Sequence, residues 1–179
     1  MRSTFVAAAC AGVLLAACGG WKAGQAGATS VIGGTSAASE MAMLAAPLSR
    51  DRALAVMKTR HDGMGAISDA FKAIHRALGP TPDLATVRAN AAKVAELSQQ
   101  ASTWFPAGTG PDVAKTRAKP EIWQNSEDFG SKLRAFQTAA RALQLAASGN
   151  DAAAIKARFA DLGGACKACH DKYRAEEQH

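Results

Sequence analysis

The sequence predicts an all-α protein folded as an antiparallel four-helix bundle. The first observation is composition: the chain of 179 residues is rich in alanine, has a single tyrosine and is 48% hydrophobic. Alanine favours helices because it loses no side-chain entropy on entering one. The second observation is a helical spacing of apolar residues in four segments, with two short joints and one longer connection between them. Amphipathic helices joined in this way predict an antiparallel bundle.

The N-terminal residues are predicted to lie outside the fold. Arg2 supplies a positive charge, and the apolar run from Phe5 to Ala17 is too short to span a bilayer, so it is typical of a secretory signal. The following Leu15-Ala16-Ala17-Cys18-Gly19 resembles the lipobox of bacterial lipoproteins. Residues 1–17 are therefore interpreted as a lipoprotein signal peptide and Cys18 as the lipidated residue. Cleavage at an ordinary signal peptidase site nearby is the alternative.

A tether is predicted for residues 18–44, and the folded domain for residues 45–179. The tether consists largely of Gly, Ala, Ser and Thr with almost no charge, and such a composition buries too little apolar surface to order itself. By resemblance, Gly19 after the lipidated cysteine fits an outer-membrane destination. We therefore expect a periplasmic protein anchored to the outer membrane by lipid.

The first helix is expected from about Leu48 to Leu78. From Met64 its apolar residues follow steps of three and four along one face, at Met64, Ile67, Phe71, Ile74 and Leu78. Gly63 and Gly65 weaken the helix, and they either allow a close approach or are simply tolerated. Gly79-Pro80 is expected to end it.

The second helix opens at Thr81-Pro82-Asp83, read as a cap, a proline in the first turn and an acid near the positive end of the helix dipole. Its apolar face comprises Leu84, Val87, Ala91, Val94, Leu97 and Ala101. A long connection follows over about residues 104–125. Because Trp104 and Trp123 provide apolar anchors, we expect the connection to pack over one end of the bundle.

The third and fourth helices show the same spacing of four and three residues. The third carries Phe129, Leu133, Phe136, Ala140, Leu143 and Ala147, and Ser148-Gly149 ends it. Asn150 or Asp151 is expected to cap the fourth helix. The apolar face of the fourth helix comprises Ile155, Phe159, Leu162, Cys166, Cys169 and Tyr173.

The fourth helix contains the run Cys166-Lys167-Ala168-Cys169-His170, a C-x-x-C-H motif that is the attachment signature of a c-type haem. Its two thiols can each form a thioether with a haem vinyl group, and His170 can bind the iron as the proximal ligand. Three alternatives are a dithiol redox motif, half of a zinc site, or coincidence. The first usually accompanies a β-α-β pattern, and the second needs another pair of cysteines. The motif therefore predicts one covalent haem c inside the bundle.

The cysteines and the charge restrict the class of protein further. Cys10 would leave with the signal peptide and Cys18 would be acylated, so no thiol remains for a disulfide. The formal net charge is +6, but the basic residues are scattered and not interleaved with aromatic residues, which argues against nucleic-acid binding. A mildly basic surface suits an acidic redox partner or anionic lipid, or serves only solubility.

The sequence resembles the class II c-type cytochromes, and within them the cytochrome c′ family, over about residues 45–177. The resemblance rests on Pro120-Glu121-Ile122-Trp123, on the haem motif followed by Asp171 and Tyr173-Arg174, and on Arg50-x-x-x-Leu54 with Met57 and Met64. It implies a four-helix bundle with the haem in its core, held by Cys166 and Cys169 with His170 as proximal ligand. Members of the family are ordinarily soluble, so the lipid anchor predicted here departs from the pattern.

The resemblance also implies a distal side to the haem. Leu54 stands where the family places its distal residue, and it has no donor atom, which implies a five-coordinate, high-spin iron. Its apolar pocket would reject water and anions but admit NO and CO. Met57, one turn along, is the alternative sixth ligand, and its other interpretation is core packing. A bis-histidine site through His61 is a further alternative.

The resemblance also implies roles for two arginines. Arg50 would lie at the haem edge and pair with a propionate, and Arg174 would lie on the proximal side; either is otherwise a solvated charge.

Three functions are compatible with these expectations. The first functional hypothesis is a gas-binding module, and the alternative is an electron carrier with a Met distal ligand. The third hypothesis is an enzyme, but the sequence shows no distal acid or base that could assist catalysis. The family also implies a homodimer through the first two helices.

Overall fold

The computed structural model describes residues 48–176, and within them the protein is built from helices. Four long helices are α2 (Arg50–Ala77), α3 (Leu84–Gln100), α5 (Ser126–Ala147) and α6 (Ala152–Tyr173). Two short ones lie in the long connection, η1 (Ala101–Thr103) and α4 (Glu121–Gln124). The prediction of an all-α four-helix bundle is confirmed. The predicted signal peptide, Cys18 and the whole predicted tether fall in residues 1–47, outside the described part.

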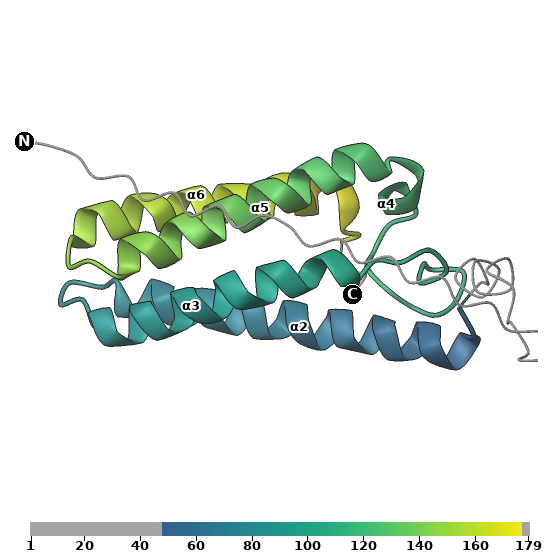
Figure 1. Cartoon of the computed structure of the whole chain (residues 1–179), viewed down its shortest axis with the longest axis horizontal. Helices are drawn as coiled ribbons and strands as arrows, with labels where there is room; N and C mark the ends of the chain where they lie inside the picture. The colour runs from purple at the N-terminus through teal and green to yellow at the C-terminus, as the bar shows by residue number, and fades with distance from the viewer. Residues whose placement is uncertain (1–47, 177–179) are drawn as a thin grey trace, which may run out of the picture. The chain divides into compact units, whose positions relative to one another are not determined.

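The four long helices form two antiparallel pairs, α2 with α3 and α5 with α6 (Figure 1). Helix α3 packs against both α2 and α5, so it joins the two pairs. The α2–α3 and α5–α6 joints lie at one end of the bundle. The other end, which we call the connection end, holds residues 101–125, the start of α2 and the C-terminal turn of α6 (Figure 1).

Side-chain caps define where α3 and α6 begin. Asp83 is the N-cap of α3, and its Oδ1 accepts hydrogen bonds of 3.1 Å from the backbone N–H groups of Ala85 and Thr86. The sequence-based assignment of Thr81 as the cap was wrong, because only the carboxylate of Asp83 reaches these free donors. Of the two candidates for α6, Asp151 is the cap, accepting from Ala153 and Ala154 at 2.9 and 3.1 Å.

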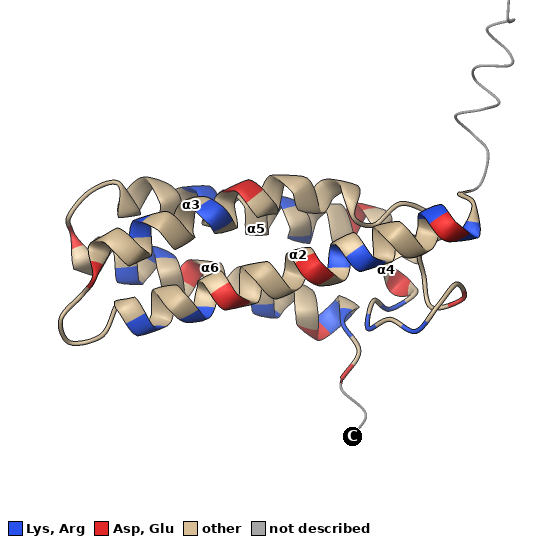
Figure 2. Ribbon diagram, turned by 90° about the horizontal axis from the view of Figure 1, so that it is seen from below, with Lys and Arg blue, Asp and Glu red and all other residues tan. Residues whose placement is uncertain are grey.

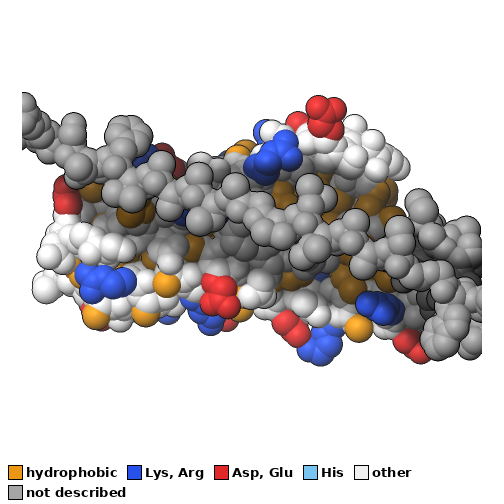
Figure 3. All heavy atoms as spheres, in the orientation of Figure 1, with side chains coloured by type: hydrophobic (Ala, Val, Ile, Leu, Met, Phe, Trp, Pro, Cys, Tyr) orange, Lys and Arg blue, Asp and Glu red, His pale blue; other side chains and the backbone are white. Residues whose placement is uncertain are grey.

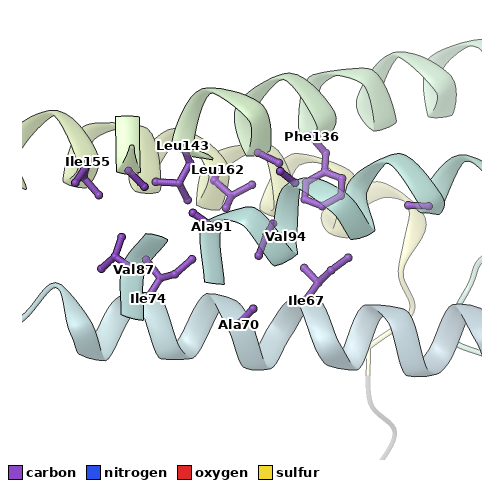
Figure 4. Packing of buried hydrophobic residues seen from close by; sticks show 14 of the residues in the cluster. Ile67, Ala70, Ile74, Val87, Ala91, Val94, Phe136, Leu143, Ile155 and Leu162 are labelled. Carbon is purple, nitrogen blue, oxygen red and sulfur yellow. The ribbon is translucent and has the colours of Figure 1, made fainter. Parts of the chain in front are cut away.

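The core follows the apolar faces predicted for the four helices. Figure 4 shows side chains from all four long helices meeting along the bundle axis. The largest fully buried apolar side chains are Ile74, Val87, Val94, Leu143, Ile155 and Leu162. Their burial is the main source of stability, at about 1.5–3 kcal/mol for each such side chain.

The connection packs on the connection end as predicted. Trp104 is 3% exposed and belongs to the main core cluster, and the indole Nε1 of Trp123 donates to the carbonyls of Phe105 and Pro106 at 3.1 and 3.0 Å. The sequence reading missed α4, whose Ile122 is buried against Phe129 and Tyr173. The connection therefore contributes its own part of the core.

The connection also pairs with the end of the chain. The backbone N–H of Lys119 donates to the carbonyl of Tyr173 at 3.0 Å, and that of Ala175 donates to the carbonyl of Arg117 at 2.8 Å. Ala118 and Arg174 form an antiparallel bridge between these two bonds. These contacts bind the segment after α6 to the long connection, next to the C-x-x-C-H motif.

Gly63 explains how Trp104 reaches the core, and it provides a first testable prediction. A Cβ atom at Gly63 would lie only 2.3–2.8 Å from three atoms of the Trp104 ring. We expect Gly63→Ala to lower the free energy of unfolding by about 1–3 kcal/mol, because a tightly packed ring must move. Chemical unfolding followed by circular dichroism measures the change.

Gly65 is the matched control for that substitution, two residues along the same helix. A Cβ atom at Gly65 would meet no atom within 4 Å beyond its chain neighbours and the backbone of its own helix. Gly65→Ala should therefore stabilise the helix by up to about 1 kcal/mol. Equal effects of the two substitutions would contradict the proposed contact between Gly63 and Trp104.

Charged side chains of both signs are spread over the surface. Figure 2 shows Lys and Arg alternating with Asp and Glu along α2 and α6, and Figure 3 shows apolar side chains between charges of both signs on another face. The ion pairs between residues of one helix are exposed, for example Lys167 with Asp171 at 2.6 Å. Such exposed pairs contribute little to stability. Within residues 48–176, no helix is long and apolar enough to cross a membrane.

Candidate functional site

The C-x-x-C-H motif lies in the last two turns of α6, at the connection end of the bundle. Cys166 and Cys169 are one turn apart, and both are free and half-buried. Cys166 packs against the main core cluster, whereas Cys169 packs against a second cluster formed by Ile122, Phe129 and Tyr173. Both thiols therefore face apolar surroundings, as attachment to an apolar macrocycle requires.

This environment changes the chemistry of the thiols. Burial raises the pKa of Cys166 to about 11, and the neighbouring Cys169 adds to the increase. Burial also raises the pKa of Cys169, while Lys132 acts in the opposite direction. Both thiols are thus protonated at neutral pH. A dithiol redox centre needs an accessible thiolate, so these surroundings do not favour that alternative.

His170 follows the cysteines and is held in the neutral form. His170 is exposed, yet enough protein surrounds the imidazole that desolvation lowers its pKa. The positive charges of Arg174 and Arg117 lower it further, against the opposing effect of Asp171. A neutral imidazole is the form that binds iron. The arrangement thus prepares His170 to be a ligand near neutral pH.

The turn that carries His170 is fixed from two sides. The phenol of Tyr173 donates to Oδ2 of Asp128 on α5 at 2.5 Å, and Nζ of Lys172 donates to the same oxygen at 2.9 Å. The Tyr173 hydrogen bond, followed by that of Lys172, lowers the pKa of Asp128. The sequence reading did not identify Asp128, although its place in the first turn of α5, beside Tyr173 in the bundle, is the signal that could have found it.

The residues predicted for the distal side lie on the first turns of α2. Leu54 is 37% exposed, which makes it one of the few large apolar side chains that the described residues leave in contact with solvent. Met57, one turn along, is buried at 8% exposure. Arg50 begins the helix and is exposed, with no ion-pair partner among residues 48–176. Among residues 48–176, no hydrogen bond, ion pair or ring contact joins these residues to His170, so their role toward iron stays a prediction.

Helices α2 and α6 are spaced in a way that suits a flat cofactor. They are joined by side chains: the rings of Phe71 and Phe159 stack at 4.3 Å between centroids, and Gly163 lies against Phe71. Their backbones do not approach as closely as those of α5 and α6 or of α2 and α3. The exposed Leu54 lies on α2, and the two thiols lie on α6. The residues present therefore fit a haem attached to α6 beside α2.

The histidines of α2 are less well placed as iron ligands. His61 is exposed on α2. His75 is also exposed, and its ring lies 6.1 Å from that of Phe159. Along α2, His75 comes after Phe71 and so lies farther from Leu54 than Phe71 does. Within residues 48–176, no three or more His, Cys, Asp or Glu residues come together to hold a metal ion by themselves. A zinc site built on Cys166 and Cys169 needs such a group.

Comparison with known proteins decides which family this site represents. The family model described as cytochrome C′ matches residues 55–174, which include the whole C-x-x-C-H motif and its flanking Tyr173 and Arg174. The chain belongs to the cytochrome c′ family. Cytochrome c′ from Allochromatium vinosum is 49% identical over 71 residues, 38% of this chain. That match covers 46% of the relative, so the chain spans about half of its length there.

Solved structures extend the comparison over the bundle. The crystal structure of cytochrome c′ from Thermochromatium tepidum is 40% identical, with a TM-score of 0.66, and covers 73% of this chain and 100% of that chain. A nitric oxide complex of a leucine-to-alanine variant of cytochrome c′ from Alcaligenes xylosoxidans is 31% identical, with a TM-score of 0.64, and covers 70% of this chain and 97% of that one. The fold class and the family predicted from the sequence are both confirmed.

Membership of the cytochrome c′ family establishes the cofactor. Cytochromes c′ are periplasmic haem proteins that carry one covalently attached haem c, and within residues 48–176 the free cysteines are Cys166 and Cys169. The prediction of one haem c is thereby confirmed. Arg50 and Leu54 lie just before the matched residues 55–174, so the comparison does not assign them a role.

Proposed function

We propose that this chain is a periplasmic cytochrome c′ with a five-coordinate, high-spin haem iron that binds NO and CO. The observation that carries the proposal is Leu54, an apolar side chain without a donor atom that is 37% exposed on α2. An apolar residue at that place favours small uncharged ligands, because water and anions would lose hydration on entering. The nitric oxide complex of the related cytochrome c′ supports gas binding in the same fold.

The residues of α6 would hold the haem in this proposal. Cys166 and Cys169 would form the two thioethers, and His170 would bind the iron on the proximal face. The haem would supply a metal centre that changes between ferric and ferrous states and binds diatomic gases. Arg174, whose charge already acts on His170, would lie on the same proximal side, while Arg50 at the start of α2 would reach a haem carboxylate.

An electron carrier with a sixth ligand is the second candidate. Met57 is the residue that favours it, because a thioether one turn from Leu54 is the nearest donor on α2. Its side chain is only 8% exposed, and it would have to leave the core to reach iron. The described residues near Leu54 do not include a histidine or carboxylate buried beside it, so a haem enzyme that cleaves O–O bonds has less support.

The partners and the location form a further part of the proposal. The basic balance of the chain, +6, suits an acidic redox protein as the electron donor. Lipid on Cys18 would hold the protein at the outer membrane through residues 18–44, and a homodimer would form through α2 and α3. These features would restrict the bundle to partners near the membrane surface.

The absorption spectrum of the purified holoprotein tests the proposal. We expect a high-spin spectrum in both oxidation states, and a large shift of the ferrous spectrum when NO or CO is added. A low-spin spectrum that is indifferent to CO would contradict it and would favour Met57 as a sixth ligand. Repeating the measurement on Met57→Leu would then separate Met57 from other ligands.

A further inference from the structure

Arg60 is a buried arginine at the connection end of the bundle, and the sequence reading did not identify it. It is 5% exposed. Its Nη1 donates to the carbonyl of Trp104 and to Oγ1 of Thr109, both at 3.2 Å. Its Nη2 donates to the carbonyl of Thr109 at 3.0 Å and to Oγ1 of Thr116 at 3.2 Å. Four hydrogen bonds thus hold the guanidinium against the long connection.

None of these four acceptors carries a charge. No carboxylate pairs with Arg60 in the part of the chain that the structure describes, although buried charges in proteins are normally paired. Desolvation lowers the pKa of Arg60, but a guanidinium keeps its proton in a protein. The bundle therefore contains one positive charge that only neutral dipoles compensate.

The charge of Arg60 contacts a group of aromatic side chains that extends to the helix carrying the haem motif. Its Cζ is 5.2 Å from the centre of the Phe105 ring. Phe105 contacts Phe129 edge-on with centroids 4.8 Å apart, and Phe129 contacts Tyr173 at 5.2 Å. Cys169 packs against the same group of side chains. One cation–ring contact and two ring–ring contacts thus link the guanidinium to the turn that carries Cys169 and His170.

We propose that the buried, unpaired charge of Arg60 raises the reduction potential of the haem and so favours the ferrous state. Ferric haem takes one electron from an external redox protein to become ferrous, and it loses one positive charge in doing so. A fixed positive charge nearby destabilises the ferric form more than the ferrous form. The inference rests on the proposed function, because ferrous iron is the state that binds CO and binds NO most tightly.

A purely mechanical role is the competing explanation. The bonds from Arg60 to Thr109 and Thr116 hold the connection against α2, so any substitution of Arg60 loosens that segment. The two explanations differ in what a lysine would do. Lysine keeps the charge but loses the planar fork and most of its hydrogen bonds. Glutamine loses the charge but retains a side-chain amide that can donate.

The experiment compares Arg60→Lys and Arg60→Gln in the holoprotein. Spectroscopic redox titration gives the reduction potential, and thermal unfolding gives the stability. We expect Arg60→Gln to raise the ferric-to-ferrous ratio about tenfold at a fixed solution potential, a fall of about 59 mV for one electron. Arg60→Lys should stay within about twofold of the wild type while losing thermal stability.

Arg88→Gln is the matched control. It removes the same charge from α3 at the opposite end of the bundle, where Nε of Arg88 donates to the carbonyl of Ala147 at 3.0 Å. We expect it to change the ratio by less than about twofold, because charges near the surface are screened by salt. A tenfold change in Arg88→Gln would mean that net charge, rather than the place of Arg60, sets the potential.

Equal shifts in Arg60→Lys and Arg60→Gln, or no shift in either, would overturn the proposal. If Arg60→Gln does not fold, Thr116→Val replaces it, since this removes one acceptor and leaves the charge. If the role is electrostatic, the ferric-to-ferrous ratio of Thr116→Val stays within about twofold of the wild type. A tenfold rise in that ratio would refute the electrostatic role. The wild-type spectrum is read first, so a low-spin protein that ignores CO would reject the proposed function separately, while the titrations would still test Arg60.

Discussion

Replacing Cys166 and Cys169 together by serine is expected to abolish covalent haem attachment. A hydroxyl does not form the thioether, so haem would leave the chain when the protein is denatured. We expect the haem stain on a denaturing gel to fall from full intensity to background, while either single substitution keeps one thioether and some stain. Mass spectrometry should show the same loss of one haem mass from the double variant.

Lys167→Ala provides the control for the double serine variant. Lys167 lies between the two cysteines, is exposed, and its ion pair with Asp171 contributes little to stability. Its substitution should leave the haem stain unchanged. Persistence of covalent haem in the double serine variant would contradict the assignment of Cys166 and Cys169.

Leu54→Met is expected to convert the haem from high spin to low spin. A methionine at position 54 would bring a thioether to the place where leucine has no donor, and the iron would become six-coordinate. We expect the ferrous spectrum to stop responding readily to CO. Leu54→Ala should act in the opposite direction and raise CO affinity about 10- to 200-fold, because it removes apolar atoms from the pocket. Optical and electron paramagnetic resonance spectra measure both effects.

Leu145 offers matched controls for both Leu54 substitutions. It is a leucine on α5 that is 76% exposed, and it does not belong to either core cluster. Leu145→Met and Leu145→Ala should leave the spin state and the gas affinity unchanged. Unchanged spectra in the two Leu54 variants would show that Leu54 is not the distal residue.

The helices and their inner faces could be predicted from sequence because burial repeats with the period of a helix. Ile74, Leu143 and Leu162 stand on the predicted faces and are fully buried. Helix ends were harder to predict, since a cap depends on which side chain reaches a free N–H group. Both Thr81 and Asp83 are suitable types, and the geometry decides for Asp83.

The candidate site could be predicted only where a motif is specific to one kind of chemistry through its residue types and their spacing. The C-x-x-C-H motif has a fixed spacing, so Cys166, Cys169 and His170 could be found without a structure. Arg60 could not, because an arginine in a sequence is ordinarily read as a solvated charge. Its signal was its position, three residues after Met57 and four before Met64, which places it on the apolar face of the first helix.

The half-buried thiols of α6 have a consequence for the order in which the protein is assembled. Addition to a vinyl group is fastest for an exposed thiolate, and the folded bundle keeps Cys166 protonated with a pKa raised to about 11. Its packing also restricts the approach of a free porphyrin. Haem attachment through these thiols is therefore favoured on the still open chain, before the last helix docks. In the cell, the attachment machinery and spontaneous folding would then compete for the same short interval.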